Sequence, residues 1–170
     1  MKRLLFVILL GVGGAYLFRT CIGGFVKVQS GSMEPTLAVY DIEWSNALYY
    51  LINPVERGDI VVFRSPVENG KGLIKRVIAV AGDTIEIRNK RIYLNWEEIT
   101  EDPHAVYKRE DEILHGDNIP EIQVPEDCVF VMGDNRDFSK DSRDWKDSSG
   151  NPVYFVPVSN IRGRINKDAE

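Results

Sequence analysis

The chain opens with an apolar segment that follows Lys2 and Arg3. Residues 4–18 carry no charged side chain, but fifteen helical residues reach only about 22 Å, against a hydrocarbon core of ~30 Å. A helix that continues to residue 26, with Arg19 extending toward the lipid headgroups, is long enough. The pattern therefore predicts one N-terminal transmembrane helix in residues 1–26, with its basic end in the cytoplasm.

A cleaved secretory signal peptide is the alternative for this segment, because Gly13 and Ala15 have the spacing of a cleavage site. Cleavage after Ala15 would leave the apolar N-terminus "YLFRTCIGGFV", which favours the anchor. Both interpretations export the rest of the chain. They predict an extracytoplasmic domain in residues 27–170, on the outer side of the cell membrane.

Beyond the anchor, strand patterns outnumber helix patterns. Residues 59–65 ("DIVVFRS") and 72–83 ("GLIKRVIAVAGD") are rich in β-branched residues and are separated by a turn-forming stretch. "DTIEIRNKRIYLN" alternates around Asn89 and Lys90, as a hairpin does. Two further strand segments are "CVFVMGDN" and "YFVPVSNIRGRI". The prediction is a mainly β fold, in which antiparallel sheets form a compact catalytic domain.

Three segments differ from this pattern. Residues 95–127 are charged and interrupted by prolines, which predicts a small peripheral lobe. Residues 146–154 predict an exposed loop that either contacts substrate or lengthens a hairpin. Residues 44–52 ("WSNALYYLI") fit a short helix or an apolar strand. Their aromatic residues fit either an ordinary core element or a patch on the bilayer.

Composition narrows the classes of function. The net charge of −5 and the lack of a sustained Lys/Arg block argue against nucleic acid as the partner. Cys21 and Cys128 are the only cysteines of the sequence, which excludes a disulfide framework or a cysteine-rich metal cluster. His104 and His115 lie in the charged segment without a second ligand at metal spacing. No metal or organic cofactor is expected.

Residues 29–37, "QSGSMEPTL", contain two serines that could attack a carbonyl carbon. A serine hydroxyl needs a base, and a lysine can be that base if burial lowers its pKa. Lys75 is the lysine that lies inside a strongly apolar strand, where alternation places it on one face with Leu73 and Val77. The alternative is a solvent-facing lysine on an edge strand.

A third motif, "GDNRDFSKDSR" (133–143), follows the strand "CVFVM" directly. Such charged loops are usually solvated turns. Here the alternating signs would also let the loop pair with itself and lie rigidly against a site.

In this order, behind a membrane segment, "SGSMEPTL", "IKRVIAVAGD" and "GDNRDFSKDSR" resemble the type I signal peptidases, membrane-bound serine-lysine endopeptidases that remove signal peptides from exported proteins. The resemblance implies that Ser32 is the nucleophile and Lys75 the general base. It also implies an oxyanion hole formed by the Ser30 side chain and the Ser32 backbone N–H.

The same resemblance implies supporting roles. Ser139 would orient the lysine amine, and Asp141 and Arg143 would form a structural charge pair. Shallow pockets for small side chains would include Met33, Leu73 and Ile74. The family then predicts cleavage after small-x-small sites such as Ala-x-Ala.

Several positions depart from the family's pattern without removing a catalytic group. Tyr40 stands where a glycine usually precedes the aspartate matched by Asp41. Gln29 replaces a frequent proline, and Phe138 replaces a small polar residue. These changes bear on backbone geometry and on the shape of the pockets.

The sequence thus predicts a membrane-bound serine endopeptidase whose partners are preprotein signal peptides and the lipid bilayer. One alternative is a dedicated processing peptidase of a conjugation or pilus system. Another is a catalytically silent, membrane-tethered module that binds exported chains. A LexA-like self-cleaving regulator shares the "SGSM" motif, but it should be cytoplasmic and carry a DNA-binding region. No oligomeric state is predicted.

Overall fold

The computed structural model describes residues 22–100 and 102–167, together with residues 3, 7, 11, 12 and 14. Most of the predicted anchor and Cys21 therefore lie outside the described residues. Within the described part of the chain, no helix is long and apolar enough to cross a membrane. The described residues form a mainly β structure of antiparallel sheets, as the strand patterns predicted.

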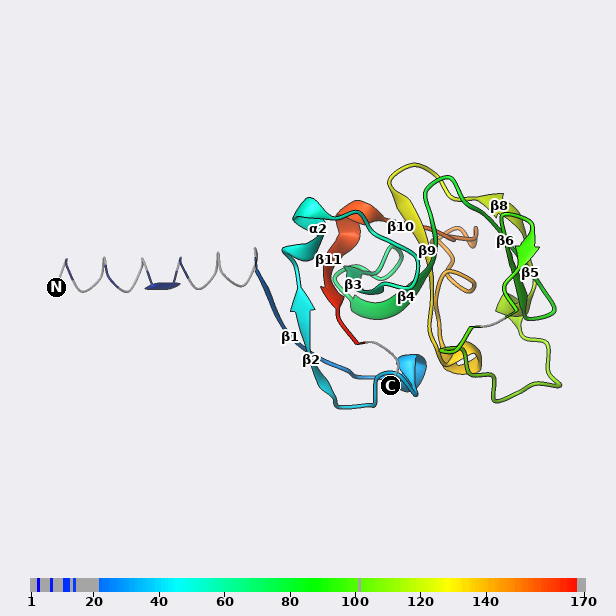
Figure 1. Ribbon diagram of the computed structural model, residues 1–170, viewed down its shortest axis with the longest axis horizontal. Coiled ribbons are helices and arrows are strands. Elements are labelled where there is room, and N and C mark those ends of the chain that lie inside the picture. Colours follow the sequence, from blue (N-terminus) through cyan, green and yellow to red (C-terminus); the bar gives the residue numbers. More distant parts are fainter. Residues whose placement is uncertain are drawn as a thin grey trace.

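The larger sheet has seven strands in the order β1-β2-β11-β3-β4-β9-β10, and neighbouring strands are antiparallel (Figure 1). Its central strands come from the β-branched runs of the sequence, which suit a pleated surface buried on its faces. The strands are β1 (Gly23–Lys27), β2 (Ile42–Asn46), β3 (Ile60–Arg64), β4 (Gly72–Val80), β9 (Cys128–Met132), β10 (Val156–Pro157) and β11 (Ile161–Ile165).

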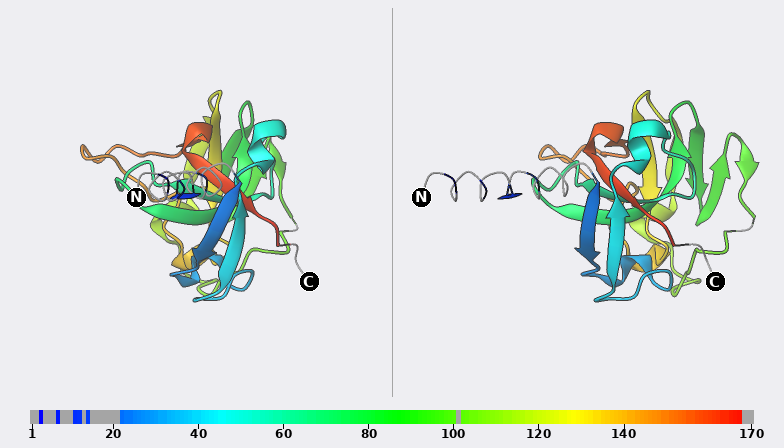
Figure 2. Two further views of the ribbon diagram at one scale, coloured as in Figure 1. Left: turned by 90° about the vertical axis from the view of Figure 1, so that its left-hand side faces the viewer. Right: turned by 60° about the vertical axis from the view of Figure 1, so that its left-hand side comes forward.

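The smaller sheet has the order β7-β6-β5-β8 and lies at the end of the domain away from β1 (Figures 1 and 2). Its strands are β5 (Thr84–Arg88), β6 (Arg91–Leu94), β7 (Glu97–Glu98) and β8 (Ile119–Gln123). Asn89 and Lys90 join β5 to β6 with φ values of 48° and 71°, a tight turn that confirms the predicted hairpin.

The peripheral lobe was predicted to start at residue 95, but the small sheet already includes the hairpin before it. The reason is strand pairing: β8, which comes from the charged segment 95–127, returns to lie beside β5. Ile119 and Val124 of that segment are buried in the core under the sheet. The segment therefore mixes an exposed excursion with a structural strand.

Helical structure in the described residues is short. Residues 44–52 divide between the end of β2 and the single turn α2 (Tyr49–Ile52), so both predicted alternatives occur there. Single 3₁₀ turns occupy Gly31–Met33, His115–Asp117, Arg136–Phe138 and Val158–Asn160. The exposed loop 146–154 closes on itself through a bridge between Lys146 and Pro152, so it lengthens a hairpin.

The buried apolar side chains form three clusters. One lies between the small sheet and β9, and includes Phe130. The second surrounds Trp145, which is 1% exposed and packs edge-on against Phe63 with 6.0 Å between ring centroids. The third lies under the 3₁₀ turn Gly31–Met33, and consists of Val28, Met33, Leu37, Ile60 and Ile165. This third cluster fixes the turn that carries the candidate nucleophile.

Replacing Trp145 by alanine should lower the free energy of unfolding by about 3–5 kcal/mol, because the change opens a large cavity in the apolar cluster that surrounds this residue. The matched control is Trp96→Ala, whose side chain is 72% exposed and should cost about 0.5 kcal/mol or less. Urea denaturation in detergent, followed by far-UV circular dichroism, measures both. Equal midpoints would show that Trp145 does not hold the large sheet.

Candidate active site

Ser32 lies in the middle of the 3₁₀ turn Gly31–Met33 and is 7% exposed. The turn is anchored by Met33 and Leu37, both buried, and the Leu37 N–H donates to the Met33 carbonyl at 2.9 Å. The first N–H groups of a helical turn have no carbonyl partner within the turn. Ser32 stands near the start of its turn, so its N–H is not used there. The local fold therefore presents the hydroxyl and the N–H of Ser32 together.

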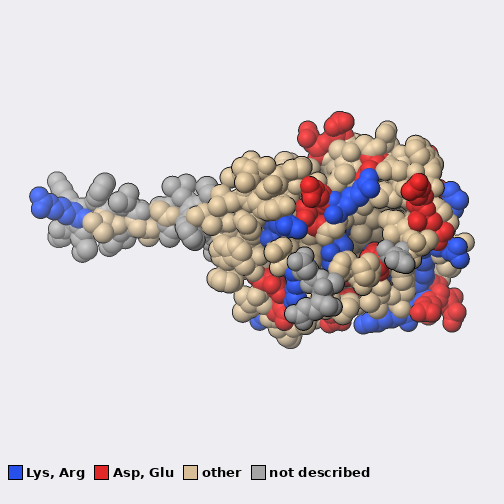
Figure 3. Space-filling model, in the orientation of Figure 1, with Lys and Arg blue, Asp and Glu red and all other residues tan. Residues whose placement is uncertain are grey.

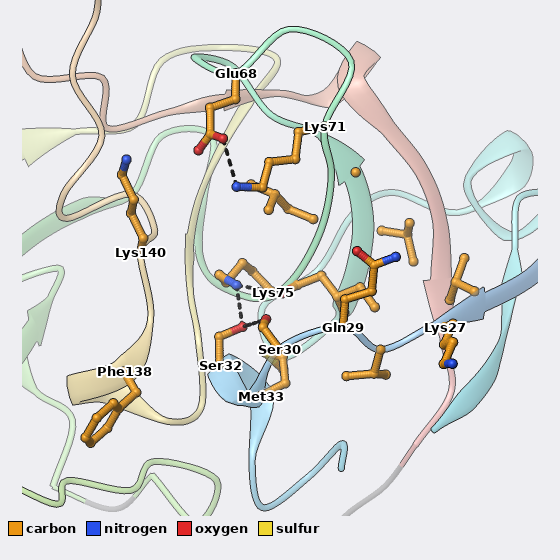
Figure 4. A pocket seen from close by; sticks show the side chains of 16 residues that line it. Lys27, Gln29, Ser30, Ser32, Met33, Glu68, Lys71, Lys75, Phe138 and Lys140 are labelled. Carbon is orange, nitrogen blue, oxygen red and sulfur yellow. Dashed lines mark hydrogen bonds and ion pairs between the residues drawn. The ribbon is translucent and has the colours of Figure 1, made fainter. Parts of the chain in front are cut away.

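Lys75 points from β4 to the same place (Figure 4). Its side-chain nitrogen Nζ lies 2.7 Å from Ser32 Oγ and donates to the Ile74 carbonyl at 3.0 Å. The residue is 3% exposed. Burial lowers the pKa of Lys75 to about 8, against the opposing charges of Asp141 and Asp134. An amine with this pKa is partly neutral near neutral pH and can accept a proton.

The pairing of β4 explains why Lys75 is both buried and reachable. Strand β3 pairs with β4 from Gly72 to Arg76, whereas β9 pairs with β4 only from Arg76 onward. In the described strand pairs, the edge of residues 72–75 that faces away from β3 has no partner. It borders a cleft of about 780 Å³ that contains Ser32 and Lys75.

The cleft brings together most of the residues implicated by the sequence. Ser30 Oγ lies 3.3 Å from Ser32 Oγ, so a second hydroxyl stands beside the nucleophile. Met33, Leu73 and Ile74 line the cleft, and their role as pocket residues stays a prediction. Further apolar lining comes from Val26, Val28 and Val62. Lys75 is thus a buried residue of an interior strand, not a solvent-facing lysine of an edge strand.

The loop 133–143 lies directly against the nucleophile's turn. Asn135 donates from its backbone N–H to the Ser32 carbonyl at 3.1 Å and from its side-chain amide to the Gly31 carbonyl at 2.9 Å. A Cβ at Gly133 would come within 2.4 Å of the Ser32 carbonyl oxygen, so only glycine permits this approach. The loop therefore clamps the backbone of the nucleophile.

A buried ion pair ties this loop to β4. Arg76 donates to both carboxylate oxygens of Asp134 at 2.8 Å, and Thr36 donates to the same carboxylate at 2.6 Å. Both charged residues are 5% exposed or less. Three segments that are distant in sequence thus meet at one carboxylate. The sequence did not reveal these roles of Arg76 and Asn135. Arg76 belongs to the motif "IKRVIAVAGD", and Asn135 belongs to "GDNRDFSKDSR".

Asp141 and Arg143 form the charge pair implied by the family resemblance, with nitrogen-oxygen distances of 2.8 and 3.0 Å. Burial acts to raise the pKa of Asp141, but the charge and hydrogen bonds of Arg143 hold it below its ordinary value. Arg143 also donates to the Arg136 carbonyl at 2.6 Å, and Asp141 accepts from the Gly133 N–H at 2.9 Å. The pair thus braces both ends of the loop.

Ser139 was expected to orient the lysine amine. Its hydroxyl is buried next to Gly133 and acts on the Asp141 carboxylate, and no hydrogen bond joins it to Lys75 in the described part of the chain. The second partner of the Lys75 amine, after Ser32, is instead the Ile74 carbonyl. The orienting role of Ser139 therefore stays a prediction.

The histidines do not approach this site. His115 is exposed, and His104 is half-buried near a small cavity on another part of the surface. No group of three or more His, Cys, Asp or Glu side chains in the described residues is placed to hold a metal ion. The side chains that line the cleft include Ser32 and Lys75.

The sequence profile of the family described as "Signal peptidase, peptidase S26" matches residues 1–167. The chain belongs to this signal peptidase family. It is therefore a serine endopeptidase of the signal peptidase I type.

Individual relatives agree with this assignment. Signal peptidase I P of Bacillus subtilis subsp. natto is 33% identical over 87% of this chain and 84% of its own length. Signal peptidase I of Bacillus amyloliquefaciens is 34% identical over 91% and 88%. The crystal structure of a signal peptidase I from Enterococcus faecalis V583 superposes with a TM-score of 0.51 at 31% identity, covering 68% of this chain and 99% of that one.

Removing the carboxylate of Asp134 should destabilise the domain strongly, because Arg76 would keep a buried, unpaired charge. We expect Asp134→Asn to lower the free energy of unfolding by about 3–5 kcal/mol. The matched control is Glu86→Gln, which breaks the exposed pair with Arg88 and should cost about 1 kcal/mol or less. Urea unfolding of both variants measures the difference, and equal midpoints would rule out the pair as the clamp of the loop.

Proposed function

We propose that this protein removes signal peptides from exported preproteins, with Ser32 as nucleophile and Lys75 as general base. The observation that carries the proposal is the 2.7 Å contact between Ser32 Oγ and a lysine amine that is 3% exposed. A serine becomes a useful nucleophile when such a base is adjacent. Its relatives from Bacillus are signal peptidases, which supports the same substrate class.

The cycle begins when the neutral amine of Lys75 takes the hydroxyl proton of Ser32. Ser32 Oγ attacks the scissile carbonyl carbon and forms a tetrahedral intermediate. The protonated Lys75 then gives its proton to the departing amine, which leaves an acyl-enzyme. Neutral again, Lys75 activates a water molecule that releases the acyl group and restores Ser32. The proton balance closes over one turnover without a metal or cofactor.

The developing oxyanion needs donors placed in advance. The N–H of Ser32 and the hydroxyl of Ser30 lie on one short turn, with the two serine Oγ atoms 3.3 Å apart. Asn135 holds the carbonyls of this turn, so the N–H groups do not have to reorient during the reaction. Ser30 is therefore the proposed side-chain donor of the oxyanion hole.

Substrate binds as an added strand in this proposal. The unpaired edge of residues 72–75 offers backbone groups to an extended peptide, whose alternate side chains enter the cleft. Met33, Leu73 and Ile74, together with three valines, give this part of the cleft apolar walls. Small apolar residues before the scissile bond fit such walls, which supports cleavage after small-x-small sites.

Membrane attachment is part of the proposal and rests on the N-terminal sequence and on one surface. Phe25 of β1 and Trp44 of β2 stack edge-on with 5.1 Å between centroids, and Leu51 and Ile52 of α2 are more than 70% exposed. Figure 3 shows that this end of the domain carries few charged side chains on the visible face. An aromatic and apolar surface with few charges suits the membrane interface.

Cleavage of a purified preprotein by the full-length chain in detergent tests the mechanism. We expect Ser32→Ala to abolish cleavage and Lys75→Ala to lower the rate by about 10²–10⁴-fold or more, because the base is lost. Lys71→Ala is the matched control, since Lys71 lines the same cleft but is exposed, and it should retain activity. A Lys75→Ala enzyme with wild-type turnover would exclude Lys75 as the base, and a wild type that cleaves no preprotein would exclude the function.

The pH profile should follow the ionisation of Lys75. The base must be neutral and its pKa is about 8, so kcat/KM should rise about tenfold per pH unit below 8 and level off above it. Initial rates on a quenched peptide between pH 5.5 and 9.5 measure the profile. A flat profile between pH 6 and 8 would contradict the assignment of Lys75.

A further inference from the structure

The cleft carries a charge opposite to that of the whole chain. Its lining includes four lysines, Lys27, Lys71, Lys75 and Lys140, and one carboxylate, Glu68. The chain as a whole has a net charge of −5. The catalytic mechanism uses Lys75 and assigns nothing to the other three.

The remaining lysines differ in what already surrounds them. Lys71 donates to Glu68 at 2.8 Å, so its charge is paired. Lys27 lies over the ring of Tyr40, with 4.9 Å from Nζ to the ring centroid. Lys140 is exposed, and its charge acts on the Glu68 carboxylate, but it forms no ion pair within 4.0 Å among the described residues. Of these three cleft lysines, Lys140 is thus the one most available to a charged ligand.

Lys140 lies on a definite side of the catalytic pair. Figure 4 shows Ser32 and Lys75 between two groups, with Lys27 and Gln29 to one side and Phe138 and Lys140 to the other. Lys27 and Gln29 belong to the segment whose valines form the apolar wall of the cleft. If small residues before the scissile bond use that wall, the residues after the bond leave on the side of Lys140.

The surroundings of Phe138 reinforce the positive charge of this rim. The ring is 52% exposed, and the charged groups of Lys108 and Arg109 lie 5.6 and 5.0 Å from its centroid. Lys108 has Glu34 at 3.8 Å and Arg109 has Glu112 at 3.6 Å, both half-exposed pairs that water screens. Lys140, two residues further along the same loop, adds a positive charge to the lining of the cleft.

We infer that Phe138 and Lys140 form a subsite for the residues that follow the scissile bond, and that it selects substrates with an acidic side chain there. This inference rests on the proposed function. The carboxylate of the substrate pairs with Lys140, while the ring of Phe138, which points away from the Lys140 amine in Figure 4, contacts a neighbouring residue of the substrate. The bond that is cleaved, and the roles of Ser32 and Lys75, do not change.

The size of the preference follows from the exposure of Lys140. An exposed ion pair changes an equilibrium by about two- to fivefold, so Glu in place of Gln should raise kcat/KM by that factor. Lys in the same place should lower it by a similar factor. Because exposed charges are screened beyond about 3 Å at 1 M ionic strength, the preference should largely disappear in 1 M NaCl.

Three quenched peptides test the subsite with the full-length enzyme in detergent. They share one small-x-small sequence before the scissile bond and carry Glu-Glu, Gln-Gln or Lys-Lys directly after it. The readout is the ratio of kcat/KM for Glu-Glu to that for Lys-Lys. We expect a ratio above one for the wild type and below one for Lys140→Glu.

Lys27→Glu is the matched control, because Lys27 is also a cleft lysine but lies on the other side of Ser32. It should keep the wild-type ratio. A ratio that stays the same in Lys140→Glu, with the Gln-Gln peptide still cleaved, overturns the subsite and leaves the proposed function intact. Failure of the wild type to cleave all three peptides and a whole preprotein overturns the proposed function and the subsite together.

Discussion

The site depends on keeping one lysine amine out of water at hydrogen-bond distance from one serine. An ammonium group in an apolar surrounding is costly unless it loses its proton or finds a partner. Lys75 meets this condition through its place in an interior strand, with a hydroxyl and a carbonyl as its hydrogen-bond partners. Any relaxation that admits water would raise its pKa again, so the surrounding structure has to be rigid as well as apolar.

That rigidity comes from ion pairs that join distant segments. Arg76 and Asp134 connect β4 to the loop after β9, and Asp141 and Arg143 close the same loop on itself. Lys90, in the turn of the small sheet, reaches Asp137 at 3.0 Å and the Arg109 carbonyl at 2.6 Å. Each buried carboxylate has a cation beside it. The net field at Lys75 therefore stays small enough for burial to determine its pKa.

Local sequence patterns were sufficient for the strands and for the tight turn at Asn89 and Lys90, because alternation and turn chemistry are short-range properties. For Lys75 they left two alternatives, a buried face or a solvent-facing edge strand, which the structure decides in favour of burial. They did not reveal that Asp134 pairs with Arg76 and not with the neighbouring Arg136, since that choice depends on which strands become adjacent. The position of the hairpin in the small sheet was missed for the same reason, because it is set by the return of β8.

The early end of β9 at Met132 has a consequence for the state of the chain that can be processed. Only a peptide in an extended conformation, with its backbone groups unpaired, can complete the edge that β9 leaves open. A helix has already used those groups internally, and the strands of a folded domain are already paired with one another. The open edge therefore selects a substrate first by its backbone conformation and only then by its sequence. A segment with a suitable sequence escapes cleavage for as long as it remains helical or folded.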